Sequence, residues 1–209
     1  MSEAKAHREL WLVRHGQTPA SLNRRLAGWE DVPLTGRGEE QAAALRPVLD
    51  GQSFEGVWSS DLQRAVRMAR LAWGDARPDR RLREMSFGSL EGAAYETLEE
   101  RWQQALARFE GFEPPGGERF EDLRERVLAF VDSLPPGRHL VFTHGGVVRL
   151  LAREVGEDRF VPTGTLLVVD WDGRRLVSRR DGEGNAGRGG PGADANEPAV
   201  PTAGGQGGA

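Results

Sequence analysis

Residues 10–16 read LWLVRHG, a short apolar run followed at once by an arginine, a histidine and a glycine. A run of this length between charged residues and a glycine predicts a buried strand that ends in a loop. Residues 139–146, HLVFTHGG, have the same arrangement, and residues 57–60, VWSS, predict a further short strand that ends in two serines. Polar side chains therefore follow the ends of three predicted strands.

Helical patterns separate these strands along the chain. Apolar residues at helical spacing predict helices over 35–51, 60–73, 95–109, 120–131 and 145–155. Ser60 and Gln63 stand three residues apart and predict a capping box at the start of the second helix. Residues 166–169 predict a last buried strand, and the turn signal at Asp172 and Gly173 predicts an antiparallel hairpin.

Strands that alternate with helices predict crossover connections and a mostly parallel sheet. We therefore expect an α/β fold, a three-layer sandwich with helices on both faces of the central sheet. Ligands of such sheets bind beyond the carboxyl ends of the strands. If the three strands are neighbours, the side chains of Arg14, His15, Arg64 and His144 converge on one pocket. Forked arginine donors and helix N-termini suit phosphate oxygens, so the sequence predicts a phosphate site that needs no metal and no cofactor.

The composition excludes several other classes of protein. The 209 residues include 28 Lys and Arg against 32 Asp and Glu, a net charge of −4, and no cysteine. A mildly acidic chain is a poor binder of nucleic acid or anionic lipid, and the absence of cysteine excludes disulfides, thiolate metal sites and cysteine nucleophiles. The start has no apolar signal-peptide region, and no segment approaches the ~18 apolar residues of a membrane span. We expect a soluble, cytoplasmic protein with neither nucleic-acid nor membrane partners.

A change of composition divides the chain. Residues 182–209 contain 10 glycines, three prolines and no aromatic side chain. Such a segment buries too little apolar surface to offset the entropy lost on ordering. We expect one domain over 1–181 and a disordered Gly/Pro-rich tail over 182–209, whose deletion should leave activity intact.

Six motifs follow one another along residues 12–146. They are LVRHGQT at 12–18, GWEDVPLT at 28–35, SSDLQRA at 59–65, LREMSFGSLEG at 82–92, PGGE at 115–118 and THGG at 143–146. Their types and order resemble the histidine phosphatase superfamily, which includes the cofactor-dependent phosphoglycerate mutases. The resemblance implies a phosphoglycerate mutase-like fold.

The resemblance also implies roles for single residues. His15 would be the nucleophile that is phosphorylated in a covalent intermediate, and Glu84 the proton donor; Arg14, Arg64 and His144 would complete the phosphate pocket. The chemistry is consistent, because nearby arginines disfavour a positive charge on the attacking imidazole and stabilise the oxygens of the transferring group.

A carboxylic acid can protonate the leaving alkoxide and later take a proton from the hydrolytic water. Glu91 competes with Glu84 for this role, because sequence spacing alone does not separate the two. The position in the family motif favours Glu84.

Five further residues are candidates for binding the substrate. Gly16 could let the backbone approach the phosphate, Thr18 could donate a hydroxyl, and Gly145 begins the helix after the second histidine motif. Many relatives have an asparagine that holds phosphate at the position of Ser21. Its absence puts one phosphate contact in doubt, and Ser21 or Asn23 could replace it.

Two features favour hydrolysis of a small phosphorylated metabolite. The acid-bearing block over 84–92 looks like the phosphatase branch of the family, and Gly146 stands where the mutase branch typically has asparagine. We therefore predict a phosphoric monoester hydrolase of the histidine acid phosphatase type. A phosphoglycerate mutase is the alternative, followed by a non-catalytic phospho-ligand-binding module. A metallohydrolase is disfavoured because no ligand pattern is present.

Residues 93–117 lie between the acid-bearing block and the Pro-Gly break, and we expect them to form the wall of the pocket. Arg101 and Arg108 could meet a second anionic group there, and Trp29 could line the entrance. Sugar phosphates, nucleotides, α-ribazole phosphate and phosphoglycerates all remain possible substrates. A homodimer is the default expectation for the assembly.

Overall fold

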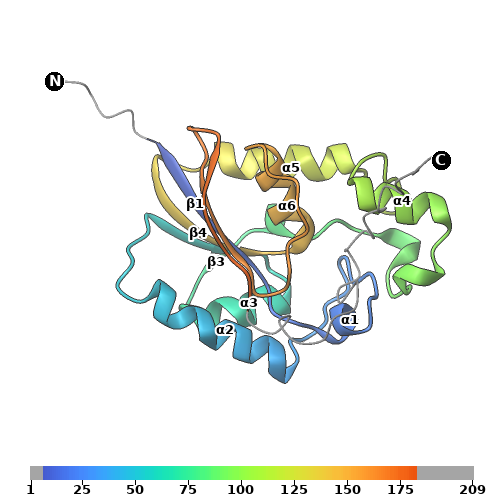
Figure 1. Cartoon of the computed structure of the whole chain (residues 1–209), viewed down its shortest axis with the longest axis horizontal. Helices are drawn as coiled ribbons and strands as arrows, with labels where there is room; N and C mark the ends of the chain where they lie inside the picture. Colours follow the sequence, from blue (N-terminus) through green and yellow to red (C-terminus); the bar gives the residue numbers. More distant parts are fainter. Residues whose placement is uncertain (1–6, 183–209) are drawn as a thin grey trace, which may run out of the picture.

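The computed structural model describes residues 7–182 (Figure 1). The strands are β1 (Arg8–Arg14), β2 (Gly56–Ser59), β3 (Arg77–Pro78), β4 (Gly137–Thr143), β5 (Leu166–Asp170) and β6 (Arg175–Arg180). The α-helices are α1 (Pro19–Leu22), α2 (Gly36–Leu49), α3 (Gln63–Ala72), α4 (Glu100–Arg108), α5 (Phe120–Asp132) and α6 (Gly145–Arg153). Short 3-10 turns cover η1 (Arg80–Leu82), η2 (Gly88–Leu90) and η3 (Tyr95–Thr97). Within this part of the chain, no helix is both long and apolar enough to span a membrane.

The strands form one sheet in the order β3-β2-β4-β1-β5-β6. β1, β2, β3 and β4 run parallel to one another, while β5 and β6 are antiparallel and form the predicted hairpin. Arg14 pairs with Thr143, and Ser59 pairs with Phe142. The carboxyl ends of β1, β4 and β2 therefore lie side by side, as the convergence of the polar residues requires.

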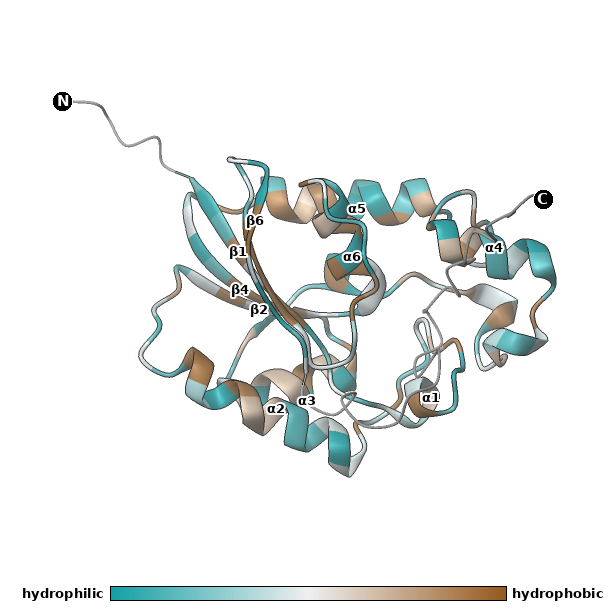
Figure 2. Ribbon diagram, viewed as in Figure 1, coloured by the Kyte–Doolittle hydropathy of each residue, from teal (hydrophilic) through white to brown (hydrophobic). Residues whose placement is uncertain are grey.

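Helices cover both faces of the sheet (Figure 1). Side chains alternate along a strand, so Val13 of β1 packs with α2 and α3, whereas Leu10 and Leu12 pack on the side of α5 and α6. Figure 2 shows the hydrophobic residues concentrated on the central strands and on the helix faces that meet them. This arrangement confirms the predicted three-layer α/β fold.

The helix predicted over 95–109 is interrupted. Residues on either side of Ala94 pair with an earlier segment, because the Leu26 amide donates to Ala93 O at 3.0 Å and the Tyr95 amide donates to Arg24 O at 2.8 Å. This pairing needs extended backbone, so only the short turn η3 forms there and α4 begins at Glu100.

The predicted capping box at Ser60 and Gln63 is wrong. The helix begins later than that pattern requires, with Leu62 at the N-cap and no side-chain cap. The Gln63 amide donates instead to Asp31 Oδ1 at 2.7 Å. The Ser60 hydroxyl instead contacts His144, the residue that directly follows the neighbouring strand β4.

The domain predicted over 1–181 includes all the described residues except Gly182, and its boundaries stay a prediction. The tail predicted over 182–209 lies outside the described residues except for Gly182. Its disorder therefore stays a prediction.

Candidate active site

The structure brings the four predicted phosphate-pocket residues together at the carboxyl edge of the sheet. Arg14 ends β1 and His15 follows it, Arg64 lies in the first turn of α3, and His144 is the N-cap of α6. All four are buried, with exposed fractions of 6%, 6%, 1% and 0% respectively. The rings of His15 and His144 meet edge to face, with centroids 5.2 Å apart.

One backbone contact sets the tautomer of His15. Its Nδ1 lies 2.8 Å from the carbonyl oxygen of Gly16. A carbonyl can only accept, so Nδ1 carries the proton and Nε2 keeps its lone pair. Burial first, and then the positive charges of Arg64 and Arg14, lower the pKa of His15 well below its usual value of 6.5. At neutral pH the ring is an uncharged base with Nε2 available for attack.

His144 has the opposite tautomer. Arg64 Nε donates to His144 Nδ1 at 3.2 Å, so Nδ1 is the acceptor and Nε2 carries the proton. That Nε2 lies 2.8 Å from Ser60 Oγ, to which it donates. Burial first, with Arg64 next, lowers the pKa of His144 well below 6.5. The two neighbouring imidazoles are therefore both neutral, but only His15 has its Nδ1 protonated.

Backbone carbonyls hold both arginines in place. Arg64 donates through Nη1 to Glu30 O at 2.7 Å and through Nη2 to Gly28 O at 2.6 Å. Burial lowers the pKa of Arg64 to about 10, which leaves the guanidinium charged at neutral pH. Arg14 Nη1 donates to Val161 O, and its guanidinium lies 5.6 Å from the centroid of the Phe160 ring. Each Nη nitrogen of a guanidinium has two hydrogens, so one such nitrogen can serve a carbonyl and a phosphate together.

Glu84 is held between two backbone amides. Its Oε1 accepts from the Met85 amide at 2.9 Å and its Oε2 accepts from the Gly146 amide at 3.1 Å. The carboxyl group is buried, with 7% of the residue exposed. A β-carbon at position 146 would collide with Glu84 Oε1, so any other residue there would have to displace the carboxyl group from this position.

Glu91, the other candidate for the acid, accepts hydrogen bonds from backbone amides of the surrounding loops. Its Oε1 accepts from the Trp29 amide at 2.9 Å and from the Phe87 amide at 3.1 Å. It does not line either of the clefts described below, whereas Glu84 lines both. The Trp29 ring nitrogen donates to Glu84 O at 2.7 Å, so this tryptophan supports the backbone of the acid. Of the two carboxylates, Glu84 is therefore the one that lies at the clefts.

Thr18 and Ser21 lie at the site but bond mainly to each other. The Ser21 amide donates to Thr18 Oγ1 at 3.1 Å, and the Thr18 amide donates to Ser21 Oγ at 2.9 Å. Together they form a capping box on α1 and line the cleft. Asn23 is not brought to the site, because its side-chain amide is exposed and donates to Pro19 O at 2.8 Å.

The two candidate glycines serve packing. A β-carbon on Gly16 would collide with the backbone of Gly38, and Gly16 does not line either cleft. A β-carbon on Gly145 would lie 3.1 Å from Arg14 Nε. Gly145 therefore lets the Arg14 guanidinium approach the start of α6. Both residues line the same cleft.

Two clefts meet at this site and share Arg14, Glu84 and Phe87. We call the first the polar cleft; its further lining residues are His15, Thr18, Ser21, Arg25, Leu26, Ala27, Gly28 and Arg64. We call the second the apolar cleft; its further lining residues are Met85, Leu106, Phe109, Gly145, Gly146, Arg149, Phe160 and Val161. His144 lines neither cleft and lies buried behind His15.

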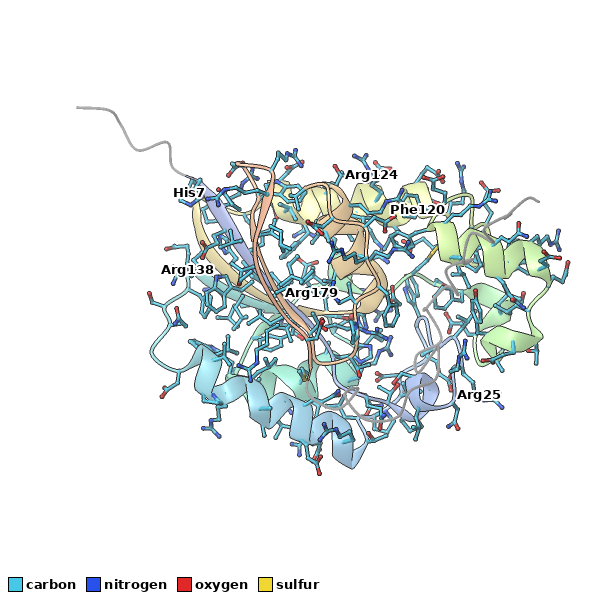
Figure 3. All side chains as sticks on the ribbon, in the orientation of Figure 1. His7, Arg25, Phe120, Arg124, Arg138 and Arg179 are labelled. Atoms are coloured by element: carbon cyan, nitrogen blue, oxygen red, sulfur yellow. The ribbon has the colours of Figure 1, made fainter. Side chains whose placement is uncertain are left out.

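Sequence reasoning missed several of these residues. Arg25, labelled in Figure 3, lies just after α1, and its Nη1 donates to Gly92 O at 2.7 Å. The sequence signal that could have identified Arg25 was its position two residues beyond Asn23, which was itself a candidate for binding the substrate. Phe160 and Val161 come from the segment between α6 and β5, where no periodic pattern marks them. Over residues 7–182, no group of three or more His, Asp or Glu side chains is arranged to hold a metal ion.

Comparisons with known proteins agree with this geometry. The model of the histidine phosphatase superfamily (branch 1) matches residues 10–177. An adenosylcobalamin/α-ribazole phosphatase from Escherichia coli (strain K12) is 36% identical, over 70% of this chain and 79% of that protein. The crystal structure of TTHB049 from Thermus thermophilus has a TM-score of 0.78 and 48% identity, covering 83% of this chain and 99% of that one.

A crystal structure of a phosphoglycerate mutase, also from Thermus thermophilus, has a TM-score of 0.77 and 50% identity, covering 82% of this chain and 97% of that one. The similarity thus includes proteins named for hydrolysis and for phosphoryl transfer. Sequence, fold and the convergence of Arg14, His15, Arg64 and His144 point to one family. The chain belongs to branch 1 of the histidine phosphatase superfamily.

Proposed function

We propose that this protein is a phosphomonoesterase that hydrolyses a small phosphorylated molecule through a phosphohistidine on His15. The observation that carries the proposal is the contact between His15 Nδ1 and the carbonyl oxygen of Gly16. Its Nδ1 proton is directed to Gly16 O, so the lone pair of Nε2 is available in a cleft that is also lined by Arg14 and Arg64. A neutral nucleophile and two cations in one cleft suit attack on a phosphate dianion.

The first step transfers the phosphoryl group to the enzyme. The phosphate dianion binds between Arg14 and Arg64, and His15 Nε2 attacks phosphorus as the ester P–O bond breaks. Glu84, in its acid form, donates a proton to the departing oxygen, and the alcohol leaves. The two guanidiniums stabilise the charge on the equatorial oxygens during transfer.

The second step returns the enzyme to its starting state. Glu84, now a carboxylate, takes a proton from water as that water attacks the phosphorus of the phosphohistidine. The P–N bond breaks, inorganic phosphate leaves, and His15 is again neutral. Proton donor and acceptor are the same group, and no external acid or base is consumed.

A mutase is the second candidate, because a protein named as a phosphoglycerate mutase is among the similar solved structures. Such an enzyme keeps the phosphoryl group and returns it to another hydroxyl. Hydrolysis is favoured here by the α-ribazole phosphatase relative and by Gly146, which stands where the sequence resemblance gives the mutase branch an asparagine.

The products distinguish these candidates. The protein is incubated with 3-phosphoglycerate and 2,3-bisphosphoglycerate, and separately with simple alkyl and aryl phosphates, while free phosphate and 2-phosphoglycerate are measured. We expect phosphate release to dominate with every ester that is turned over. Efficient isomerisation with little free phosphate would establish the mutase instead, and binding without turnover would establish a phospho-ligand-binding module.

A further inference from the structure

We propose that the apolar cleft receives the alcohol part of the substrate and selects phosphomonoesters with an uncharged, apolar leaving group over esters that carry a second anion. This inference rests on the proposed function and names the substrate class of the same site. Three observations carry it: the position of His15 relative to the two clefts, the lining of the apolar cleft, and the bonds already made by Arg149.

The direction of attack assigns the leaving group to the apolar cleft. In phosphoryl transfer the attacking and leaving atoms lie roughly in line on opposite sides of phosphorus. His15 lines the polar cleft only, whereas Glu84 lines both clefts. A leaving oxygen that departs away from His15 and meets Glu84 therefore carries its substituent toward the apolar cleft.

The walls of that cleft have little to offer a polar substituent. Met85 and Phe87 come from the acid-bearing block, Leu106 and Phe109 come from α4 and its end, and Phe160 comes from the segment before β5. Aromatic and aliphatic side chains gain from burying a ring or an alkyl chain, and they leave a hydroxyl or carboxylate without a partner.

The cations at the cleft offer no unbalanced charge to a second anion. Arg14 binds the phosphate in the proposed mechanism. Arg149 donates through Nε to Asp158 Oδ1 at 2.7 Å. The Nη nitrogens of Arg149 donate to the backbone carbonyls of Leu106 and Ala107 at 3.3 and 3.0 Å. Its charge is thus balanced by an acid, and its guanidinium links α6 to α4.

The two arginines that the sequence offered for a second anion are placed elsewhere. Arg101 forms an ion pair with Glu99 at 3.0 Å, and its side chain is 66% exposed. Arg108 is exposed as well, and neither residue lines the apolar or the polar cleft. A carboxylate in the apolar cleft would therefore be desolvated without a compensating charge.

The test compares kcat/KM for 2-phenylethyl phosphate, ethyl phosphate, glycerol 1-phosphate and 3-phosphoglycerate. All four are esters of aliphatic alcohols. We expect the phenylethyl ester to exceed the ethyl and glycerol esters by roughly 30-fold, and 3-phosphoglycerate by more, because an apolar pocket discriminates by about 10–200-fold for each well-placed group. Equal values, or a preference for 3-phosphoglycerate, would overturn the inference while leaving hydrolysis in place.

A paired substitution locates the selectivity. Leu106→Gln places an amide in the apolar cleft and should lower kcat/KM about 10-fold more for the phenylethyl ester than for ethyl phosphate. Val177→Gln is the control, because Val177 is 46% exposed on β6 and lies outside both clefts. Equal loss for both esters in a folded Leu106→Gln protein would contradict the assignment.

The inference can fail separately from the proposed function. If the wild-type protein hydrolyses none of the four esters, the proposed function fails. The same esters are then ranked by calorimetric Kd. Tightest binding of the phenylethyl ester would still support the apolar cleft as the binding site, and equal Kd values would overturn it.

Discussion

The polar and apolar clefts meet at Glu84 but are built in different ways. The reactive groups of the polar cleft lie within a few residues of the ends of β1 and β2, and His144, which supports them, directly follows β4. The apolar cleft is assembled from α4, α6, the acid-bearing block and the segment before β5, with Arg14 shared between the two clefts. Hydrogen-bonded strands fix the positions of the reactive groups in the polar cleft, whereas loops and short helices form the walls of the apolar cleft. In the proposed function, the sheet therefore positions the reactive groups, and the loops select the alcohol.

Removing the nucleophile tests the polar cleft most severely. His15→Ala deletes the attacking nitrogen, so hydrolysis of every ester should fall by at least about 10³-fold, with no acid-labile phosphoenzyme. Steady-state rates and acid-quenched labelling measure the two effects. Unchanged hydrolysis by a folded His15→Ala protein would show that another group attacks phosphorus.

The junction between the clefts is tested by Gly146→Ala. The new β-carbon collides with Glu84 Oε1 and displaces the carboxyl group, so protonation of the leaving group should become slower. We expect kcat to fall about 10²-fold for ethyl phosphate. The loss should be much smaller for 4-nitrophenyl phosphate, because nitrophenolate leaves without a proton.

Gly36→Ala is a matched control for Gly146→Ala. Gly36 is the first residue of α2, and a β-carbon there would meet nothing within 4 Å. Its kinetics should equal those of the wild type. An equal loss for both leaving groups in Gly146→Ala would mean that the substitution disturbs the site in general and does not act through the acid.

A smaller effect is expected behind the polar cleft. Ser60→Ala removes the acceptor of the His144 Nε2 proton and leaves that buried group unpaired. A lost buried hydrogen bond of about 1–1.5 kcal/mol corresponds to roughly a 10-fold fall in kcat/KM if it is felt in the transition state. Ser133→Ala, at the end of α5, is the control. Rates unchanged by Ser60→Ala would show that the orientation of His144 does not matter for turnover.

The two buried histidines also predict how stability depends on pH. Their pKa values are lowered in the folded protein, so below about pH 6.5 the unfolded chain binds more protons than the folded one. Stability is complete above that pH and falls as the pH decreases, by up to about 1.4 kcal/mol per histidine per pH unit. Urea unfolding at pH 7.5 and 5.5 measures this. A flat profile that is the same in wild type and His144→Gln would contradict neutral burial of His144.

The same contrast between the clefts explains what the sequence could predict. Arg14, His15 and His144 are adjacent to apolar runs that form strands, so their convergence follows once those strands are neighbours. Local pattern was misleading for Ser60, whose hydroxyl bonds His144 at a separation of 84 residues. A contact of that range has no sequence signal.

Glu84 and Glu91 show the same limit. Both lie in one irregular block, and the choice depends on which backbone amides meet each carboxylate in the folded chain. Phe109 and Phe160 of the apolar cleft come from opposite ends of the α5–α6 region and carry no periodic pattern that joins them. Tertiary packing alone brings them to one cavity.

The position of the phosphoryl group on the enzyme tests the mechanism most directly. Labelled substrate is mixed rapidly with the protein, the reaction is quenched, and the phosphorylated atom is identified by peptide mass spectrometry and ³¹P NMR. We predict one labile phosphoryl group on His15, attached at Nε2, because Nδ1 donates its proton to Gly16 O. A phosphoryl group on His144 or on Nδ1 of His15 would contradict this mechanism. Release of phosphate without any phosphorylated residue would contradict it as well.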